Sequence, residues 1–136
     1  MRVYLDSSAL LKRVIEEPES EQLRVTLRKH VNERAVLLSS RLASVEVSRA
    51  IRMRFDTGYA TAAEFVDDAM SGVAEHAISD EVVSLSQRLN PQRLRSLDAI
   101  HVASAMLLEA NLLITYDDRM ADAGQRNGLP CAAPGR

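Results

Sequence analysis

Residues 3–12, VYLDSSALLK, contain the change of pattern that decides the predicted fold. The apolar residues 3–5 favour a short β-strand, which ends at Asp6. Ser7 and Ser8 are good N-cap residues, so we expect a helix to follow them and to continue through Ile15. A strand, an acid and a helix in immediate succession are typical of α/β proteins, whose ligands bind where parallel strands end.

The same alternation continues along the rest of the chain. Short apolar runs predict further strands over residues 35–38, 76–79, 112–115 and 131–133. Helical spacing of apolar residues, with polar caps and glycine or proline stops, predicts helices over residues 18–31, 42–55, 61–73, 81–90, 97–110 and 119–124. The pattern predicts an α/β protein, a three-layer α/β/α sandwich with a short, mostly parallel sheet, formed as a single domain over residues 1–136.

Composition excludes several classes of protein. The 136 residues include 17 Lys and Arg against 19 Asp and Glu, and the resulting net charge of −2 argues against binding of nucleic acid by bulk charge alone. Cys131 is the single cysteine, so no internal disulfide can form and a reducing cytoplasm is the expected location. No apolar run approaches the ~20 residues that cross a bilayer, so we expect no association with a membrane.

Acidic residues gather at positions that a parallel sheet brings together. Asp6, Asp117 and Asp118 directly follow predicted strands, and Glu46 and Asp98 lie near the starts of predicted helices. Four ionised carboxylates within about 5 to 6 Å form six pairs, each repelling by roughly 3 kcal/mol at an effective dielectric near 20. That sum rivals the ~5 to 15 kcal/mol stability of a whole domain, so protons or cations must neutralise the cluster. Oxygen-only ligands favour Mg²⁺ or Mn²⁺ over zinc.

Each acid also has a purely structural interpretation. Asp6 can cap the helix that follows it, and Asp98 in a first turn is stabilised by the helix macrodipole. Glu46 can pair with Arg49 on the next turn, and the two acids after residue 115 can form an ordinary turn and cap. It is their joint placement on one predicted edge that favours a functional site.

Four segments together carry a resemblance to a known family. They are YLDSSALLK (4–12), SSRLASVEVSRAI (39–51), LRSLDAIHVASAMLLEA (94–110) and LLITYDDRMADAGQRNGL (112–129). Each motif is weak alone, but in this order and at these separations the chain resembles, over essentially its whole length, the PIN-domain ribonucleases, and in particular the VapC-type toxins of prokaryotic type II toxin–antitoxin pairs. The resemblance implies a PIN-like fold.

The resemblance also implies an activity and a set of site residues. It implies a cytoplasmic, metal-dependent endoribonuclease, the toxin of its pair, that acts on RNA, forms a homodimer and is blocked by a cognate antitoxin. It implies Mg²⁺ or Mn²⁺ held by Asp6, Glu46, Asp98 and Asp117, with Asp118 as a less certain fifth ligand. Ser7 and Thr115 match the family's small hydroxylated positions, where a hydroxyl supports the acids.

Basic and aromatic residues near these acids suggest how substrate is held. Arg13, Arg49 and Arg52 are predicted to bind RNA phosphates, although solvated surface charge is the alternative for each. His101, one turn beyond Asp98, either orients that carboxylate or is an ordinary core histidine.

Three other functions compete with the ribonuclease. A phospho-receiver domain needs a lysine late in the sheet, but the only lysines are Lys12 and Lys29. Dehalogenase-type phosphatases have a second aspartate two residues after the first, where this chain has Ser8. A non-catalytic binding module would use its acids mostly as caps and would dock a partner helix on an exposed apolar stripe around Phe65 and Met70.

Overall fold

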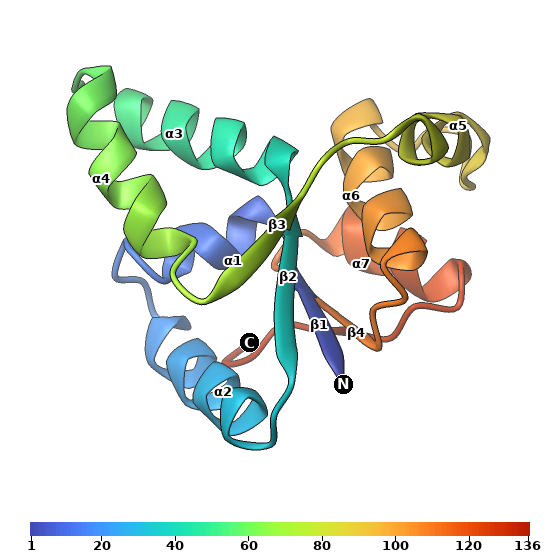
Figure 1. Ribbon diagram of the computed structural model, residues 1–136, viewed down its shortest axis with the longest axis horizontal. Coiled ribbons are helices and arrows are strands. Elements are labelled where there is room, and N and C mark those ends of the chain that lie inside the picture. Colours follow the sequence, from blue (N-terminus) through green and yellow to red (C-terminus); the bar gives the residue numbers. More distant parts are fainter.

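A five-stranded sheet forms the centre of the protein (Figure 1). The computed structural model describes all residues 1–136. The strand order is β3-β2-β1-β4-β5, and every neighbouring pair is parallel, so the sheet is wholly rather than mostly parallel. The strands are β1 (Arg2–Leu5), β2 (Val36–Ser40), β3 (Val73–His76), β4 (Leu112–Ile114) and β5 (Cys131–Ala132).

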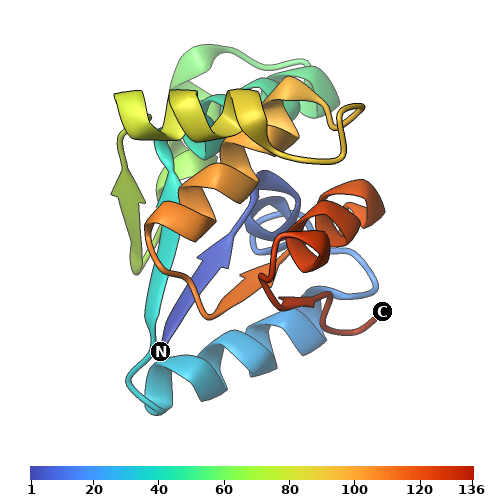
Figure 2. The ribbon, with the colours of Figure 1, turned by 90° about the vertical axis from the view of Figure 1, so that its right-hand side faces the viewer.

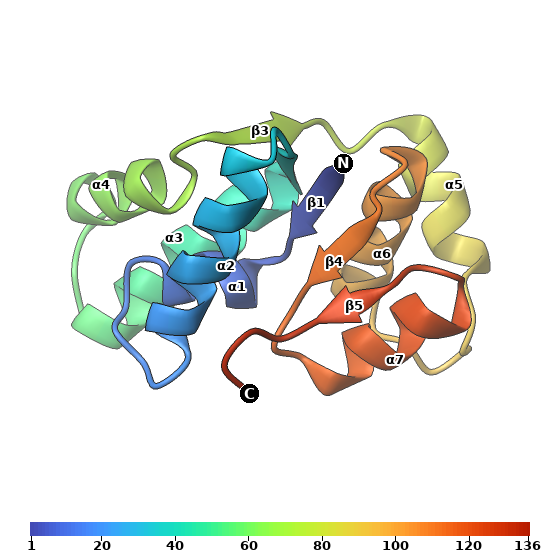
Figure 3. The ribbon, with the colours of Figure 1, turned by 90° about the horizontal axis from the view of Figure 1, so that it is seen from below.

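Seven helices cover the two faces of this sheet, which confirms the three-layer α/β/α sandwich. They are α1 (Ser7–Lys12), α2 (Ser20–Asn32), α3 (Arg41–Phe55), α4 (Tyr59–Ala69), α5 (Asp80–Arg88), α6 (Ser96–Leu107) and α7 (Asp118–Arg126). Viewed from below, α1 to α4 lie on one side of the sheet and α5 to α7 on the other (Figure 3). None of these helices combines the length and the apolar character needed to cross a membrane.

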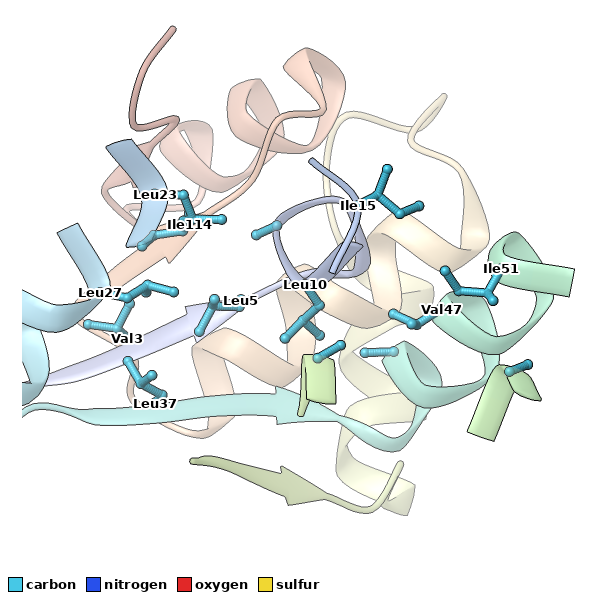
Figure 4. Packing of buried hydrophobic residues seen from close by; sticks show 14 residues of the cluster. Val3, Leu5, Leu10, Ile15, Leu23, Leu27, Leu37, Val47, Ile51 and Ile114 are labelled. Atoms are coloured by element: carbon cyan, nitrogen blue, oxygen red, sulfur yellow. The ribbon is translucent and has the colours of Figure 1, made fainter. Parts of the chain in front are cut away.

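Alternate residues of β1 face the two layers, and each layer has its own apolar core. Val3 and Leu5 belong to a cluster of 14 buried residues with α1 to α4 (Figure 4), whereas Tyr4 points into a cluster of eight with α6 and α7. Because both faces of a central parallel strand are buried, β1 is apolar at every position after Arg2. As predicted, α6 lies in the interior, with Ala99 and residues 101–105 buried.

Two predicted boundaries differ from the structure around β3. The helix predicted over residues 61–73 ends at Ala69, and the strand predicted over residues 76–79 begins earlier, at Val73. Gly72 has a φ of 75°, a backbone conformation that ends the turn after the helix and starts the strand at the next residue. Because Val73 is apolar and continues the helical spacing, the predicted helix ran past the actual end of α4.

The structure also corrects two predictions about apolar side chains. The first helix ends at Lys12 rather than at Ile15, although Ile15 is still buried in the first core. Phe65 and Met70 do not form an exposed docking stripe, because both are half-buried against that core. The Phe65 ring stacks on Phe55, with ring centroids 5.5 Å apart.

Candidate active site

The candidate acids lie beyond the carboxyl ends of the three middle strands, β2, β1 and β4. Asp6 follows β1 directly, and Asp117 lies three residues after the end of β4. Glu46 projects from α3, which begins at the end of β2, and Asp98 lies in the first turn of α6. Because parallel strands end on a common edge, the fold brings four distant segments to one region.

Asp6 is almost completely buried and accepts three hydrogen bonds. Its Oδ1 accepts from the Ser8 hydroxyl at 2.6 Å and from the backbone N–H of Ala9 at 3.0 Å. Its Oδ2 accepts from the Thr115 hydroxyl at 2.6 Å. Asp6 itself, and not Ser7 or Ser8, is therefore the N-cap of α1.

The hydroxyl that supports Asp6 from its own helix belongs to Ser8 rather than to Ser7. The Ser8 hydroxyl also accepts the backbone N–H of Tyr116 at 2.9 Å and so joins β1 to the loop after β4. Ser7, the position favoured by its place after the first acid, makes no side-chain hydrogen bond in the structure. A helix of 3.6 residues per turn, capped by Asp6, turns the second hydroxyl back toward the carboxylate, and this geometry was the missing signal.

Burial dominates the electrostatics of Asp6. Removal from water raises the pKa of its carboxyl above the ordinary aspartate value, whereas the nearby His101 and the donors from Ser8, Thr115 and Ala9 lower it. The net direction is upward. The hydrogen bonds thus hold Asp6 in position but do not fully compensate for the cost of burying its charge.

Glu46 is the end of a relay of side chains that reaches into the second core. Nε2 of the fully buried His101 lies 2.5 Å from Oε1 of Glu46, and its Nδ1 lies 2.8 Å from the hydroxyl of Tyr4. An ionised carboxylate only accepts hydrogen bonds, so Nε2 carries the proton. Burial, and then the charge of Asp6, raise the Tyr4 pKa, so the phenol stays protonated, and its hydroxyl pairs with Nδ1 of the imidazole. His101 therefore orients Glu46, not Asp98 as one prediction had it.

The pKa of Asp98 is affected by the charges of the other acids. Burial raises its pKa most, the charges of Asp117 and Glu46 raise it further, and those of His101 and Arg95 lower it. No hydrogen bond or ion pair engages its carboxylate. Asp98 therefore lies within electrostatic range of both Asp117 and Glu46.

Asp117 is oriented by the helix that it begins. Its Oδ1 accepts the backbone N–H groups of Arg119 and Met120 at 2.9 and 3.2 Å, as the N-cap of α7. The Thr115 hydroxyl, which donates to Asp6, accepts the backbone N–H of Asp117 at 3.0 Å. One threonine thus ties together the acids of β1 and β4.

Four other predicted residues have different environments. Asp118 points to solvent, with 87% of its side chain exposed, and pairs with Arg136 at 3.2 Å. Arg13 donates to the backbone oxygens of Ala69 and Ser71 at 2.6 and 3.0 Å, so its guanidinium ties α1 to the end of α4. Arg49 and Arg52 are exposed on α3 and line a separate cavity of about 360 Å³ between α3 and α4.

The oxygen ligands of these acids suit a hard cation, but their side chains lie too far apart in this structure to surround one. No group of three or more His, Cys, Asp or Glu side chains lies close enough together to hold a metal ion. The oxygen donors of Asp6, Glu46, Asp98 and Asp117 nevertheless form the type of ligand set that Mg²⁺ and Mn²⁺ prefer. Burial, and then the charge of Asp117, raise the pKa of Asp98, and a divalent cation bound beside this carboxylate would offset both effects.

Comparison with known proteins gives a consistent result. The PIN domain family model matches residues 3–125. Ribonuclease VapC46 of Mycobacterium tuberculosis is 40% identical over 134 residues, which are 97% of each chain, and ribonuclease VapC47 of the same species is 32% identical over 135 residues, 98% of this chain and 97% of that one.

Solved structures of low sequence identity share the fold. VapBC2 from Rickettsia felis, bound to a DNA fragment from its promoter, superimposes with a TM-score of 0.78 at 11% identity and covers 98% of this chain and 99% of that one. VapC20 of Mycobacterium tuberculosis, described as a sarcin–ricin loop cleaving toxin, gives a TM-score of 0.69 at 13% identity and covers 90% and 95%.

Proposed function

Since this chain belongs to the PIN-domain family, among the VapC ribonucleases of toxin–antitoxin systems, we propose that it is a divalent-metal-dependent endoribonuclease that hydrolyses RNA phosphodiester bonds. One observation carries the proposal. Acids from four separate segments share the edge of the sheet where ligands of parallel α/β folds bind, and Asp98 experiences the charges of Asp117 and Glu46 there.

Asp6, Glu46, Asp98 and Asp117 are the residues that would hold Mg²⁺ or Mn²⁺. When bound, such an ion supplies a water that is nucleophilic at neutral pH and stabilises negative charge on the phosphate oxygens, so no side-chain nucleophile is needed. Asp118 is less suited to this role, because its exposed carboxylate already pairs with Arg136.

The protein's own residues divide the remaining work. Ser8 and Thr115 hold Asp6, and His101 holds Glu46, so these carboxylates keep one orientation during turnover. Asp98 has no donor of its own, so one of its oxygens can help to hold the metal while the other orients a water and accepts its proton, as the water attacks phosphorus and the P–O bond to the leaving ribose oxygen breaks. We therefore assign Asp98 as the general base.

The proposal extends to partners. The Rickettsia felis relative was solved as a VapBC assembly, and by analogy we expect a cognate antitoxin to block this acidic edge. A homodimer stays a prediction, and light scattering of the purified protein tests it. A non-catalytic binding module has less support, because the apolar stripe on which it depended is half-buried.

The central experiment measures cleavage of labelled single-stranded RNA by the purified protein with Mn²⁺, with Mg²⁺ and with EDTA. We expect cleavage with either metal and none with EDTA. Asp98→Asn should lower the rate by at least 100-fold, the lower range for loss of a general base. Asp68→Asn, which removes an exposed acid from α4, is the matched control and should leave the rate unchanged.

Metal binding has a readout that does not depend on cleavage. A ligand that binds only the folded state raises its melting temperature, so Mn²⁺ should stabilise the parent and the Asp68→Asn variant, but stabilise Asp6→Asn much less. Cleavage at the parental rate by Asp98→Asn, or equal stabilisation of all three proteins by Mn²⁺, would contradict the assignment.

A further inference from the structure

A second cavity lies beside the acidic edge, and its lining is basic. It has a volume of about 540 Å³ and lies between the segment before α6 and the first turns of α7. Arg93, Arg95 and Arg119 line it together with Asp118 and Asp122. Figure 2 shows α7 and the segment before α6 on the same side of the molecule.

The positive charge in this cavity is not compensated. Arg93, Arg95 and Arg119 form no ion pair and no side-chain hydrogen bond. Both acids of the lining are already paired with other arginines, Asp122 with Arg126 at 2.8 Å and Asp118 with Arg136 at 3.2 Å. Three planar guanidinium groups are thus left to face the cavity, and such groups match phosphate oxygens in bidentate geometry.

The cavity is connected to the acids through the chain itself. Arg95 is the N-cap of α6 and lies close enough to Asp98 to affect its carboxylate, and Arg119 follows Asp117 by two residues. The Asn127 side chain donates to the backbone oxygen of Asn90 at 3.0 Å, which fixes the segment before α6 against α7. The walls of the cavity are therefore held together by the fold, and the cavity adjoins the candidate active site.

We propose that Arg93, Arg95 and Arg119 form a phosphate-binding subsite that holds the RNA backbone next to the scissile bond. This inference rests on the proposed ribonuclease function and identifies where its substrate is gripped. The acidic edge repels a polyanion, so substrate needs compensating positive charge nearby, and these three arginines supply it without base-specific contacts. Arg13, predicted for this role, is instead committed to the carbonyl groups of Ala69 and Ser71.

The test measures RNA binding apart from cleavage. Fluorescence anisotropy of a short labelled single-stranded RNA in EDTA gives the affinity over a range of salt concentrations. Counterion release predicts a log–log salt slope of about −0.7 per phosphate contact on a single strand, which corresponds to on the order of tenfold in affinity per contact near 50 mM salt. The R93Q/R95Q/R119Q triple variant should therefore bind at least 100-fold more weakly, and its slope should be smaller in magnitude by about 2.

Arg28 provides the matched control. It is exposed and unpaired on α2, which packs on the opposite face of the sheet, and R28Q changes the net charge as each single substitution does. We expect R28Q to retain parental affinity and slope. With Mn²⁺, the R93Q/R119Q double variant should show a raised KM and a nearly parental kcat for RNA cleavage, since it keeps every acid and also Arg95, whose charge acts on Asp98.

The results separate this inference from the proposed function. Unchanged affinity and slope in the triple variant, or an equal loss in R28Q, would overturn the subsite while leaving cleavage by the parent intact. Binding of an acidic peptide that depends on the three arginines, with RNA binding unaffected, would overturn it as well. Arginine-dependent RNA binding by a parent that cleaves no RNA would support the subsite and reject the nuclease.

Discussion

Replacement of Thr115 by valine tests the design of the site most directly. Thr115 is 2% exposed, and its hydroxyl donates to Asp6 at 2.6 Å and accepts the N–H of Asp117 at 3.0 Å. A hydrogen bond to a charged group contributes about 1.5 to 3 kcal/mol, and the N–H left without an acceptor costs about 1 kcal/mol more. The added methyl group returns less than about 1 kcal/mol. We therefore expect Thr115→Val to lower the free energy of unfolding by about 2 to 4 kcal/mol.

Thr115→Ser is the matched control, since serine keeps both hydrogen bonds and loses one buried methyl group at a cost of about 1 kcal/mol. Urea unfolding near neutral pH should rank the proteins as threonine, then serine, then valine. Mn²⁺ affinity, measured by calorimetry, should be similar for threonine and serine and lower for valine, because the hydroxyl that the first two share fixes Asp6 relative to Asp117.

Burial of apolar surface alone gives the opposite order, with valine at least as stable as threonine. A valine variant that equals or exceeds the parent in both stability and Mn²⁺ affinity would therefore refute the reasoning. A serine variant as damaged as valine would show that the methyl group, and not the hydroxyl, is what the site needs.

Three more predictions follow from the same contacts. In metal-free buffer, the parent should lose stability relative to Asp6→Asn as the pH rises above the usual aspartate pKa of 3.8, because burial raises the folded-state pKa of Asp6 and the unfolded chain ionises first. Thermal melts across pH check this, and a parent whose melting temperature rises relative to that of Asp6→Asn over this range would contradict it. Tyr4→Phe removes the hydrogen-bond partner of His101 Nδ1 and leaves that buried nitrogen unpaired, so the free energy of unfolding should fall by about 1 to 3 kcal/mol in urea unfolding, while Glu46 keeps the proton on Nε2; a variant as stable as the parent would show that this hydrogen bond contributes nothing. Arg13→Met should lower stability by about 1 to 3 kcal/mol in urea unfolding and leave RNA affinity unchanged, and a weakened affinity for RNA would restore its predicted role.

Local sequence signals were sufficient for the fold and for the location of the acids. The short apolar run with β propensity in residues 3–5 predicted β1, and the acid directly after it marked the edge where ligands bind. The boundary after α4 was wrong because the sequence around Val73 satisfies a helical period as well as a strand. There the backbone conformation of Gly72, and not hydrophobicity, decides where the helix ends.

The contacts that orient the acids were less accessible to sequence reasoning, because they join positions far apart in the chain. His101 and Glu46 are separated by 55 residues, and only the packing of α3 against α6 brings them together. On its own helix His101 lies one turn from Asp98, so local spacing pointed to the wrong acid. The choice between Ser7 and Ser8 likewise depended on which residue capped α1.

The hydrogen-bond donors are distributed unevenly among the four acids, and this difference separates their proposed roles. Asp6 receives three donors, Glu46 receives the imidazole of His101, and Asp117 receives two backbone N–H groups from α7. Asp98 receives none, and it is also the carboxylate whose pKa is raised by burial and by two neighbouring acids. The fold therefore holds three of the acids in fixed orientations by hydrogen bonds and leaves the fourth without a donor. A carboxylate without a donor keeps its lone pairs available to accept a proton from water, which is why we propose Asp98 rather than the other three acids as the group that activates water.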